Sequence, residues 1–150
     1  MNAAVEKFGP INILAANAGI TESLSYPIWK MPLDFWERTN RINVRGTFLT
    51  IKHFLLQAEK WQESEGKELE NLSIVITGSV CGKVGLVRHA EYASGKAGLQ
   101  VGLVKSVKNE IVRLNSRARI NAVAPGWVDT PLVGDQLDNP AELYHHTQST

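Results

Sequence analysis

Residues 72–96 read LSIVITGSVCGKVGLVRHAEYASGK, and this stretch decides the fold of the chain. Its first seven residues are mostly apolar or β-branched and end at a glycine, which predicts a buried strand. A glycine-bearing loop follows and allows the chain to bring Ser79 back over Tyr92. If the next segment is helical, the spacing of four between Tyr92 and Lys96 puts both side chains on one face.

The hydroxyl, phenol and amine of this stretch are able to form an acid–base site. An ammonium group close to a phenol favours the phenolate by Coulomb attraction, so we expect Tyr92 to exchange a proton near neutral pH. The alternative is that Tyr92 and Lys96 lie on a half-buried helix face without a catalytic role, because short motifs often match by chance. The remainder of the chain has to decide between these interpretations.

Two further apolar runs predict strands. Residues 11–16, INILAA, lie between Gly9-Pro10 and Asn17-Ala18-Gly19, and residues 119–124, RINAVA, precede Pro125-Gly126. The first run is short and nearly continuous, which is typical of a strand that is buried on both faces of a parallel sheet. The chain therefore has three predicted strands.

Two long helices are predicted between these strands. Asp34 is the expected N-cap of the first, which extends over residues 35–63, and the second extends over residues 92–115. The apolar stripe of the first helix consists of Val44, Phe48, Ile51 and Leu55. The second helix carries two such stripes. More than a sheet is needed to cover both, so we expect either a homo-oligomer formed through the two helices or burial within a larger monomer.

The order strand, helix, strand, helix, strand predicts right-handed βαβ units, a parallel sheet and a single α/β domain over residues 1–150. In such sheets ligands bind outside the carboxyl ends of the strands. The three strands are followed by Asn17-Ala18-Gly19, Gly78-Ser79 and Pro125-Gly126, and Tyr92 comes soon after the second. These groups are therefore expected at one crevice, which favours an active site over a core tyrosine.

Composition excludes several classes of function. The chain has 150 residues, of which 43% are hydrophobic and 21% charged, and its net charge of +1 makes nucleic acid or an anionic membrane an unexpected partner. No apolar run is long enough to span a bilayer, and the N-terminus does not resemble a signal peptide. The single cysteine, Cys81, fits a reducing compartment, so we expect a cytoplasmic protein. His53, His89, His145 and His146 show no metal-ligand spacing, and we expect no metal and surface histidines.

Five motifs follow one another along the chain. They are Asn17-Ala18-Gly19, Asn43 within Arg41-Ile42-Asn43-Val44-Arg45-Gly46, Ser79 thirteen residues before Tyr92, Tyr92-Ala93-Ser94-Gly95-Lys96, and Asn121-Ala122-Val123-Ala124-Pro125-Gly126-Trp127-Val128-Asp129-Thr130. In this order and at these spacings they resemble the short-chain dehydrogenase/reductase family over essentially the whole chain. The resemblance implies a partial Rossmann-like, doubly wound parallel sheet with three core strands and two long helices.

The resemblance also implies site residues. It implies a catalytic tetrad of Asn43, Ser79, Tyr92 and Lys96 that acts with NAD or NADP on a small carbonyl or alcohol substrate. Tyr92 would be the general acid–base, and Ser79 would hold the substrate oxygen. Lys96 would lower the pKa of Tyr92 and bind the nicotinamide ribose, and Asn43 would seat a water. The implied cofactor-binding residues are Asn17, Ala18, Gly19, Val44, Tyr92, Lys96, Pro125, Gly126, Val128 and Thr130. Asn43 as a helix-kink residue, Ser79 as a loop cap and Thr130 as a turn residue remain alternatives.

One element of the family pattern has no counterpart in the sequence. The family's proteins open with a strand and a glycine-rich turn that bind the pyrophosphate, and this chain contains no such turn. We therefore expect a sheet without the first βαβ units, with an open edge at its first strand and both helices on one face. Three interpretations follow: an incomplete product of an active dehydrogenase, a short chain that recovers a site by pairing with another, or a non-catalytic remnant that acts by binding.

The substrate is the least defined part of the prediction. By family analogy, residues 23–31 and 133–144 line the substrate side. Trp29, Trp127 and Leu132 predict an apolar pocket that fits a medium-sized ketone or secondary alcohol. The segment that distinguishes NAD from NADP would lie in the part of the family pattern that has no counterpart here.

Overall fold

The structure is a computed structural model that describes residues 1–22, 24–128 and 130. Its centre is a parallel sheet of three strands in the order β1-β2-β3. The strands are β1 (Ile13–Ala16), β2 (Ser73–Thr77) and β3 (Arg119–Val123). This arrangement confirms the predicted α/β fold with a partial Rossmann-like sheet.

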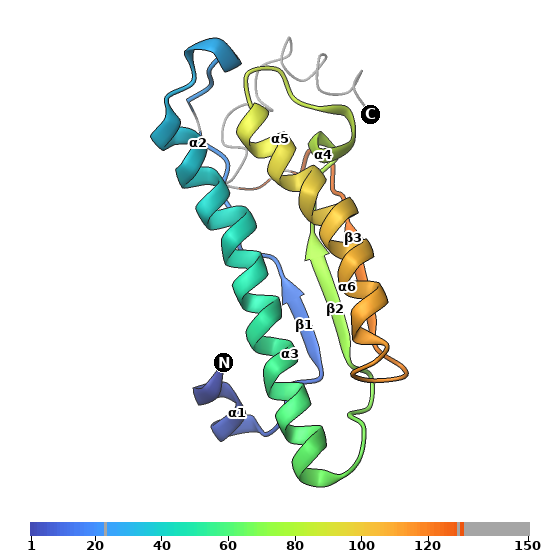
Figure 1. Ribbon diagram of the computed structural model, residues 1–150. Helices are drawn as coiled ribbons and strands as arrows, with labels where there is room; N and C mark the ends of the chain where they lie inside the picture. The colour runs from blue at the N-terminus through green and yellow to red at the C-terminus, as the bar shows by residue number, and fades with distance from the viewer. Residues whose placement is uncertain (23, 129, 131–150) are drawn as a thin grey trace.

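Two long helical segments connect the strands, as the predicted βαβ order requires (Figure 1). The first runs through α2, a π-helical turn and α3, and the second through α5, another π-helical turn and α6. The helices and helical turns are α1 (Asn2–Phe8), η1 (Ile28–Lys30), α2 (Leu33–Asn40), η2 (Arg41–Arg45), α3 (Gly46–Glu65), α4 (Cys81–Val84), α5 (Ala90–Ala97), η3 (Gly98–Leu103) and α6 (Val104–Ile111).

Both long helical segments cover the same face of the sheet, as expected (Figure 1). Along β2, Ile74 and Ile76 are buried beneath them, whereas Val75 between these residues is 37% exposed. Ile13 of β1 and Val123 of β3 are exposed on the second face as well. The prediction that the strand at residues 11–16 is buried on both faces is therefore wrong for Ile13, because the long helices lie against the other face.

The core lies between the covered face and the two helical segments. Its buried members from the helices include Ile51, Phe54, Ala58, Leu99, Val107 and Ile111, which pack with Ile74, Ile76 and Ile120 of the sheet. Fully burying one such large side chain stabilises a fold by about 1.5–3 kcal/mol. This core fixes the positions of the two helices relative to the strand ends.

Glutamine side chains of α3 pair main-chain groups that lie outside the sheet ladder. Gln57 donates from Nε2 to the carbonyl of Ile11 at 2.8 Å and accepts from its N–H at 3.3 Å. Gln62 accepts from the N–H of Leu69 at 2.9 Å and donates to the carbonyl of Leu114 at 2.9 Å. Partly buried main-chain groups thereby find partners that the secondary structure does not supply.

Some local predictions differ from the structure. Helix α2 begins at Leu33, so Asp34 lies in its first turn and accepts from the N–H of Phe35 instead of capping the helix. Phe48 is 48% exposed, because the buried side of α3 carries Thr47 and Ile51. The predictions for residues 133–144, Leu132 and the two C-terminal histidines lie outside the described residues.

Candidate active site

The carboxyl ends of the three strands point to one end of the molecule, where α4 and α5 begin (Figure 1). The Oγ1 of Thr77 donates to the Oδ1 of Asn17 at 2.9 Å, which joins the ends of β2 and β1. The N–H of Gly78 donates to the carbonyl of Val123 at 2.7 Å, so the contact between β2 and β3 continues past the end of β2. The segments that follow the strands are therefore held side by side.

Ser79 follows β2 and is buried, with 7% of its surface exposed. Its main-chain N–H donates to the Oε1 of Gln100 at 2.8 Å. Its Oγ accepts from the N–H of Cys81 at 3.1 Å, one of the free donors in the first turn of α4. Because the hydroxyl oxygen accepts this bond, its own proton remains for donation to another group.

Tyr92 and Lys96 lie on α5, one turn apart. Lys96 is buried, and its Nζ donates to the carbonyl of Thr77 at 2.7 Å. The same Nζ lies 5.6 Å from the centroid of the Tyr92 ring. The ammonium group is therefore tied to the end of β2 and also lies near the phenol ring.

Burial is the largest cause of the pKa shifts of Tyr92 and Lys96. It raises the pKa of Tyr92 above its ordinary value, and a hydrogen bond with Ser79 offsets part of this shift. Burial also lowers the pKa of Lys96. Burial therefore moves the pKa of Tyr92 in the opposite direction to the lowering that was expected from Lys96.

Asn43 lies in the π-helical turn η2 and is 2% exposed. Its side chain pairs with the main chain of Ile20, accepting from the N–H at 2.7 Å and donating to the carbonyl at 2.8 Å. A Cβ atom on Gly19 would lie 3.1 Å from the Oδ1 of Asn43 and 3.6 Å from the Nζ of Lys96. The loop after β1 is therefore held close to Lys96 at a position where glycine leaves room.

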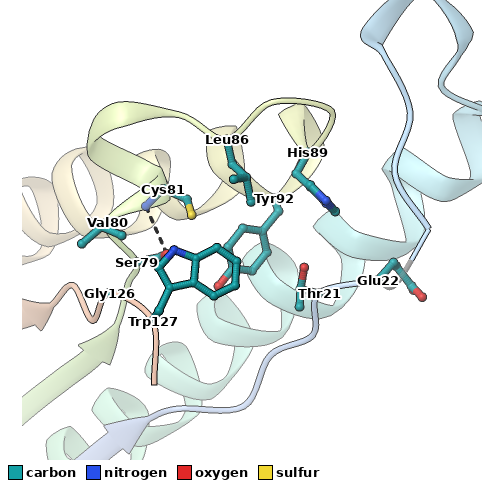
Figure 2. A pocket seen from close by; sticks show the side chains of 10 residues that line it. All are labelled: Thr21, Glu22, Ser79, Val80, Cys81, Leu86, His89, Tyr92, Gly126 and Trp127. Atoms are coloured by element: carbon teal, nitrogen blue, oxygen red, sulfur yellow. Dashed lines mark hydrogen bonds between the residues drawn. The ribbon is translucent and has the colours of Figure 1, made fainter. Parts of the chain in front are cut away.

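Two cavities meet at Ser79, Tyr92 and Gly126, which line both. The larger has a volume of about 410 Å³ and is lined by Asn17, Ala18, Gly19, Ile20, Thr77, Gly78, Ser79, Tyr92, Lys96, Pro125, Gly126, Val128 and Thr130. The smaller has a volume of about 100 Å³, and Figure 2 shows Leu86 and the Trp127 indole around the Tyr92 ring. A group bound in one cavity can therefore contact a group bound in the other beside Tyr92.

His89 also lines the smaller cavity, where Figure 2 shows it beside Tyr92. Its side chain is 18% exposed, so the prediction of a surface residue is wrong for this histidine. Its Nδ1 lies 3.7 Å from the Oε1 of Glu91, a fully buried side chain whose two oxygens have no hydrogen-bond partner among the described residues. The lining of the small cavity thus includes the polar side chains of Thr21, Glu22 and His89 beside the apolar Leu86 and Trp127.

Most residues predicted to bind the cofactor line the larger cavity, but Val44 does not. A Cβ atom on Gly95 would lie 3.1 Å from the Cγ2 of Val44, so Val44 packs beneath α5. Trp29, predicted on the substrate side, is 79% exposed and lines a separate hollow with Tyr26.

Sequence reasoning missed Ile20, Thr77 and Gly78 of the larger cavity, as well as Gln100, which holds Ser79. Gln100 follows Lys96 at the same spacing of four that separates Lys96 from Tyr92, and this repeat was an available signal. The described residues contain no group of three or more His, Cys, Asp or Glu placed to hold a metal ion. None of the described helices is both long and apolar enough to cross a membrane.

The family model of the short chain dehydrogenases matches residues 1–141. The chain belongs to this family. It is 35% identical over 133 residues to cis-4-hydroxycyclohexanecarboxylate dehydrogenase of Sinomonas cyclohexanicum, an alignment that covers 89% of this chain and 49% of the relative. It is 36% identical to acetoacetyl-CoA reductase of Synechocystis sp. over 85% of this chain and 48% of that protein. The chain therefore spans about half the length of these curated relatives.

A solved structure of this short chain dehydrogenase fold supports the same architecture. The crystal structure of the NADH-dependent reductase A1-R′ in complex with NAD superposes with a TM-score of 0.68 at 25% sequence identity. The superposition covers 85% of this chain and 51% of the reductase. The short chain dehydrogenase described here thus corresponds to about half of that structure.

Proposed function

We propose that this short chain dehydrogenase carries the catalytic residues for hydride transfer between NAD or NADP and a ketone or secondary alcohol, with Tyr92 as the acid–base group. The observation that carries the proposal is the position of Ser79 and Tyr92 on the wall shared by two cavities. One cavity contains the strand ends and Lys96, and the other is smaller and is lined in part by Leu86 and Trp127. This division suits a reaction between a large cofactor and a small substrate.

The larger cavity has the properties needed for the nicotinamide end of the cofactor. Gly19 leaves a space that a Cβ atom would fill, next to Asn43 and the ammonium of Lys96. Lys96 would bind the ribose hydroxyls, and Asn17, Ala18, Pro125, Gly126, Val128 and Thr130 would line the remainder. When bound, the nicotinamide supplies or accepts the hydride.

The protein residues handle the proton. In carbonyl reduction, the Oη of Tyr92 donates its proton to the substrate oxygen as negative charge develops there, and in alcohol oxidation it accepts that proton. The hydroxyl of Ser79 donates a hydrogen bond to the same oxygen and stabilises its charge. The raised pKa of Tyr92 keeps the phenol protonated at neutral pH, which is the form required for reduction.

A small carbonyl or alcohol is the proposed substrate, because the smaller cavity has a volume of only about 100 Å³. We also propose a homo-oligomer through the outer sides of the two long helical segments. Phe48 on α3, Val101 on η3 and Val112 after α6 are each close to half exposed. Burying such apolar surface is a common reason for association. A cytoplasmic location remains a proposal that rests on the single cysteine.

The test of catalysis compares wild type with Tyr92→Phe. Hydride transfer is followed by nicotinamide absorbance with NADH and NADPH against a panel of small ketones, and cofactor affinity by calorimetric titration. Loss of a general acid–base lowers such a rate by about 10²–10⁴-fold, and cofactor affinity should change little. Equal rates for the two proteins would refute the role of Tyr92.

A non-catalytic protein that acts by binding another chain is the second candidate. The observation in its favour is the open face of the sheet, where Ile13 is 64% exposed and Val123 is 50% exposed. Under this alternative, NADH and NADPH give no calorimetric binding signal, and sedimentation shows a defined complex with another chain. Tyr92→Phe would leave that complex and its biological effect unchanged.

A further inference from the structure

Gln100 lies in the π-helical turn η3, one turn after Lys96, and its side chain points to the end of β2 rather than to solvent. Its Oε1 accepts from the N–H of Ser79 at 2.8 Å. A π-helical turn contains an extra residue, which changes the direction of the side chains that follow it, and such turns are frequent at functional sites. The turn therefore allows a helix residue to reach the main chain of the catalytic loop.

Glycines on both sides make room for this side chain. A Cβ atom on Gly78 would overlap the Oε1 of Gln100 and would lie 3.0 Å from the carbonyl of Val123. A Cβ atom on Gly82 would lie 2.9 Å from the Cδ of Gln100 and 2.8 Å from the main-chain nitrogen of Ala97. The amide of Gln100 thus fills the space between the end of β2 and the loop that contains α4.

The bond to Gln100 completes the set of contacts that fix Ser79. Gln100 holds the main-chain N–H, and the N–H of Cys81 donates to the Oγ. With its N–H and its oxygen both engaged, the serine hydroxyl is left to donate toward the phenol of Tyr92, with which it lines both cavities. Loss of the Gln100 contact frees the main chain at the residue whose hydroxyl has to be placed.

We infer that Gln100 is a positioning residue, which keeps the Ser79 hydroxyl directed at the Tyr92 oxygen by accepting the Ser79 main-chain hydrogen bond. The inference rests on the proposed hydride-transfer function. Gln100 contacts neither substrate nor cofactor in this role and acts only through Ser79.

A matched control exists within the same chain. Gln57 is also a partly buried helical glutamine that pairs with a main-chain N–H, that of Ile11, but it does so before β1 and away from the cavities. Gln57→Met and Gln100→Met both remove an acceptor for a main-chain N–H and keep the length of the side chain. A purely structural role predicts similar consequences for the two variants.

The decisive measurement is the titration of Tyr92, because it needs neither cofactor nor turnover. Tyr26 and Tyr144 are replaced by Phe, and phenolate absorbance is followed with pH in this background, with Gln100 intact or with Gln100→Met or Gln57→Met added. Because the hydrogen bond from Ser79 lowers the pKa of Tyr92, Gln100→Met should move the titration to higher pH. Gln57→Met should not. An unchanged titration in Gln100→Met overturns the inference.

Amide hydrogen exchange at Ser79 provides a second readout. We expect slow exchange in wild type and in Gln100→Glu, which keeps an acceptor oxygen, and at least tenfold faster exchange in Gln100→Met. Fast exchange of the Ser79 amide in wild type would overturn the inference even if Gln100→Met does not fold. In the hydride-transfer assay, Gln100→Met should be slowed roughly tenfold and Gln57→Met not at all. An active wild type with a fully active Gln100→Met contradicts the inference alone, whereas a full rate in Tyr92→Phe contradicts the proposed function.

Discussion

The two π-helical turns, η2 and η3, occupy comparable places on the covered face of the sheet. Each interrupts a long helical segment, and each carries an amide side chain that pairs with main chain just beyond a strand end. Asn43 of η2 binds Ile20 after β1, and Gln100 of η3 binds Ser79 after β2. The same device is therefore used twice to attach loops of the candidate active site to the helices.

The Asn43 and Gln100 side chains differ in their burial and in the number of main-chain hydrogen bonds that they form. Asn43 is 2% exposed and pairs with both the N–H and the carbonyl of Ile20, whereas Gln100 is only partly buried and accepts from one N–H. Asn43 thus fixes a whole peptide unit beside Gly19 and Lys96. Gln100 fixes one donor of the serine that faces Tyr92. The comparison teaches that the first turn holds the loop that follows β1, next to Lys96, whereas the second holds the main chain of Ser79. Under the proposed function, these are the cofactor side and the serine that stabilises the substrate oxygen.

The largest expected effect is a difference in protein stability between variants of Asn43 and Gln100. Asn43→Leu leaves the N–H and carbonyl of Ile20 without their partners and should lower the free energy of unfolding by about 2–4 kcal/mol. Gln100→Met, which loses one bond at a less buried site, should lower it by about 1 kcal/mol. Urea unfolding of both variants measures the difference. Equal losses would show that the two turns are equivalent.

A methyl group placed beside each amide tests how tightly it is enclosed. Gly78→Ala should destabilise by about 1–3 kcal/mol, because the added Cβ meets Gln100 and a main-chain carbonyl at 3.0 Å. In Gly19→Ala, the added Cβ lies 3.1 Å from the Oδ1 of Asn43 and meets no main-chain atom as closely. This variant should therefore lose less stability than Gly78→Ala. In a double-mutant cycle, Gln100→Ala removes the side chain that the new Cβ meets. The double variant should therefore be less destabilised than the sum of the two single variants. Purely additive effects would contradict the close contact.

Stability at alkaline pH tests the raised pKa of Tyr92, the residue that Ser79 faces. Because the pKa of Tyr92 is raised in the folded state above the ordinary value of 10.0, the unfolded chain loses this proton first. The folded state then holds more protons, so stability falls as pH rises above about 10. Burial of Lys96 acts in the opposite direction, because its lowered pKa makes stability rise with pH below 10.5. Comparing wild type with Tyr92→Phe isolates the tyrosine, and wild type should lose stability more steeply above pH 10. Parallel curves would contradict the raised pKa.

The smallest expected effect concerns glycine. Turn η3 contains Gly98 and Gly102, whereas η2 contains no glycine, so the π-helical geometry does not depend on this residue. A Cβ atom on Gly102 would meet nothing within 4 Å. Gly102→Ala should therefore stabilise the chain by about 0.5–1 kcal/mol through its higher helix propensity. A lower thermal midpoint would indicate that η3 needs glycine after all.

The sequence predicted the three strands, both long helices and the single edge at which the strand ends meet. It succeeded because apolar runs of different period specify strands and helices locally, and because the βαβ order leaves few arrangements. Ser79, Tyr92 and Lys96 were found for the same reason, since a loop of fixed length and a spacing of four bring them together. Asn43 was found only through the family motif.

Other features could not be read from spacing. Val44 belongs to a predicted motif, but the packing of α5 on α2 and η2 takes it beneath Gly95. The pKa of Tyr92 is raised because residues from several elements bury the phenol, and the spacing from Lys96 does not reveal this burial. His89 was assigned to the surface because nothing local shows that it lines a cavity with Trp127.

By itself, the sequence determined the order of the elements, the family, and the residue types available at the strand ends. These depend on local propensity and on chain connectivity. The open face of the sheet was already expected from the order of the elements. Only the tertiary structure decided that two cavities share Ser79 and Tyr92. It also placed Gln100 on the main chain of Ser79. The reason is physical: burial, desolvation and side-chain hydrogen bonds between distant segments arise only when the helices pack on the sheet.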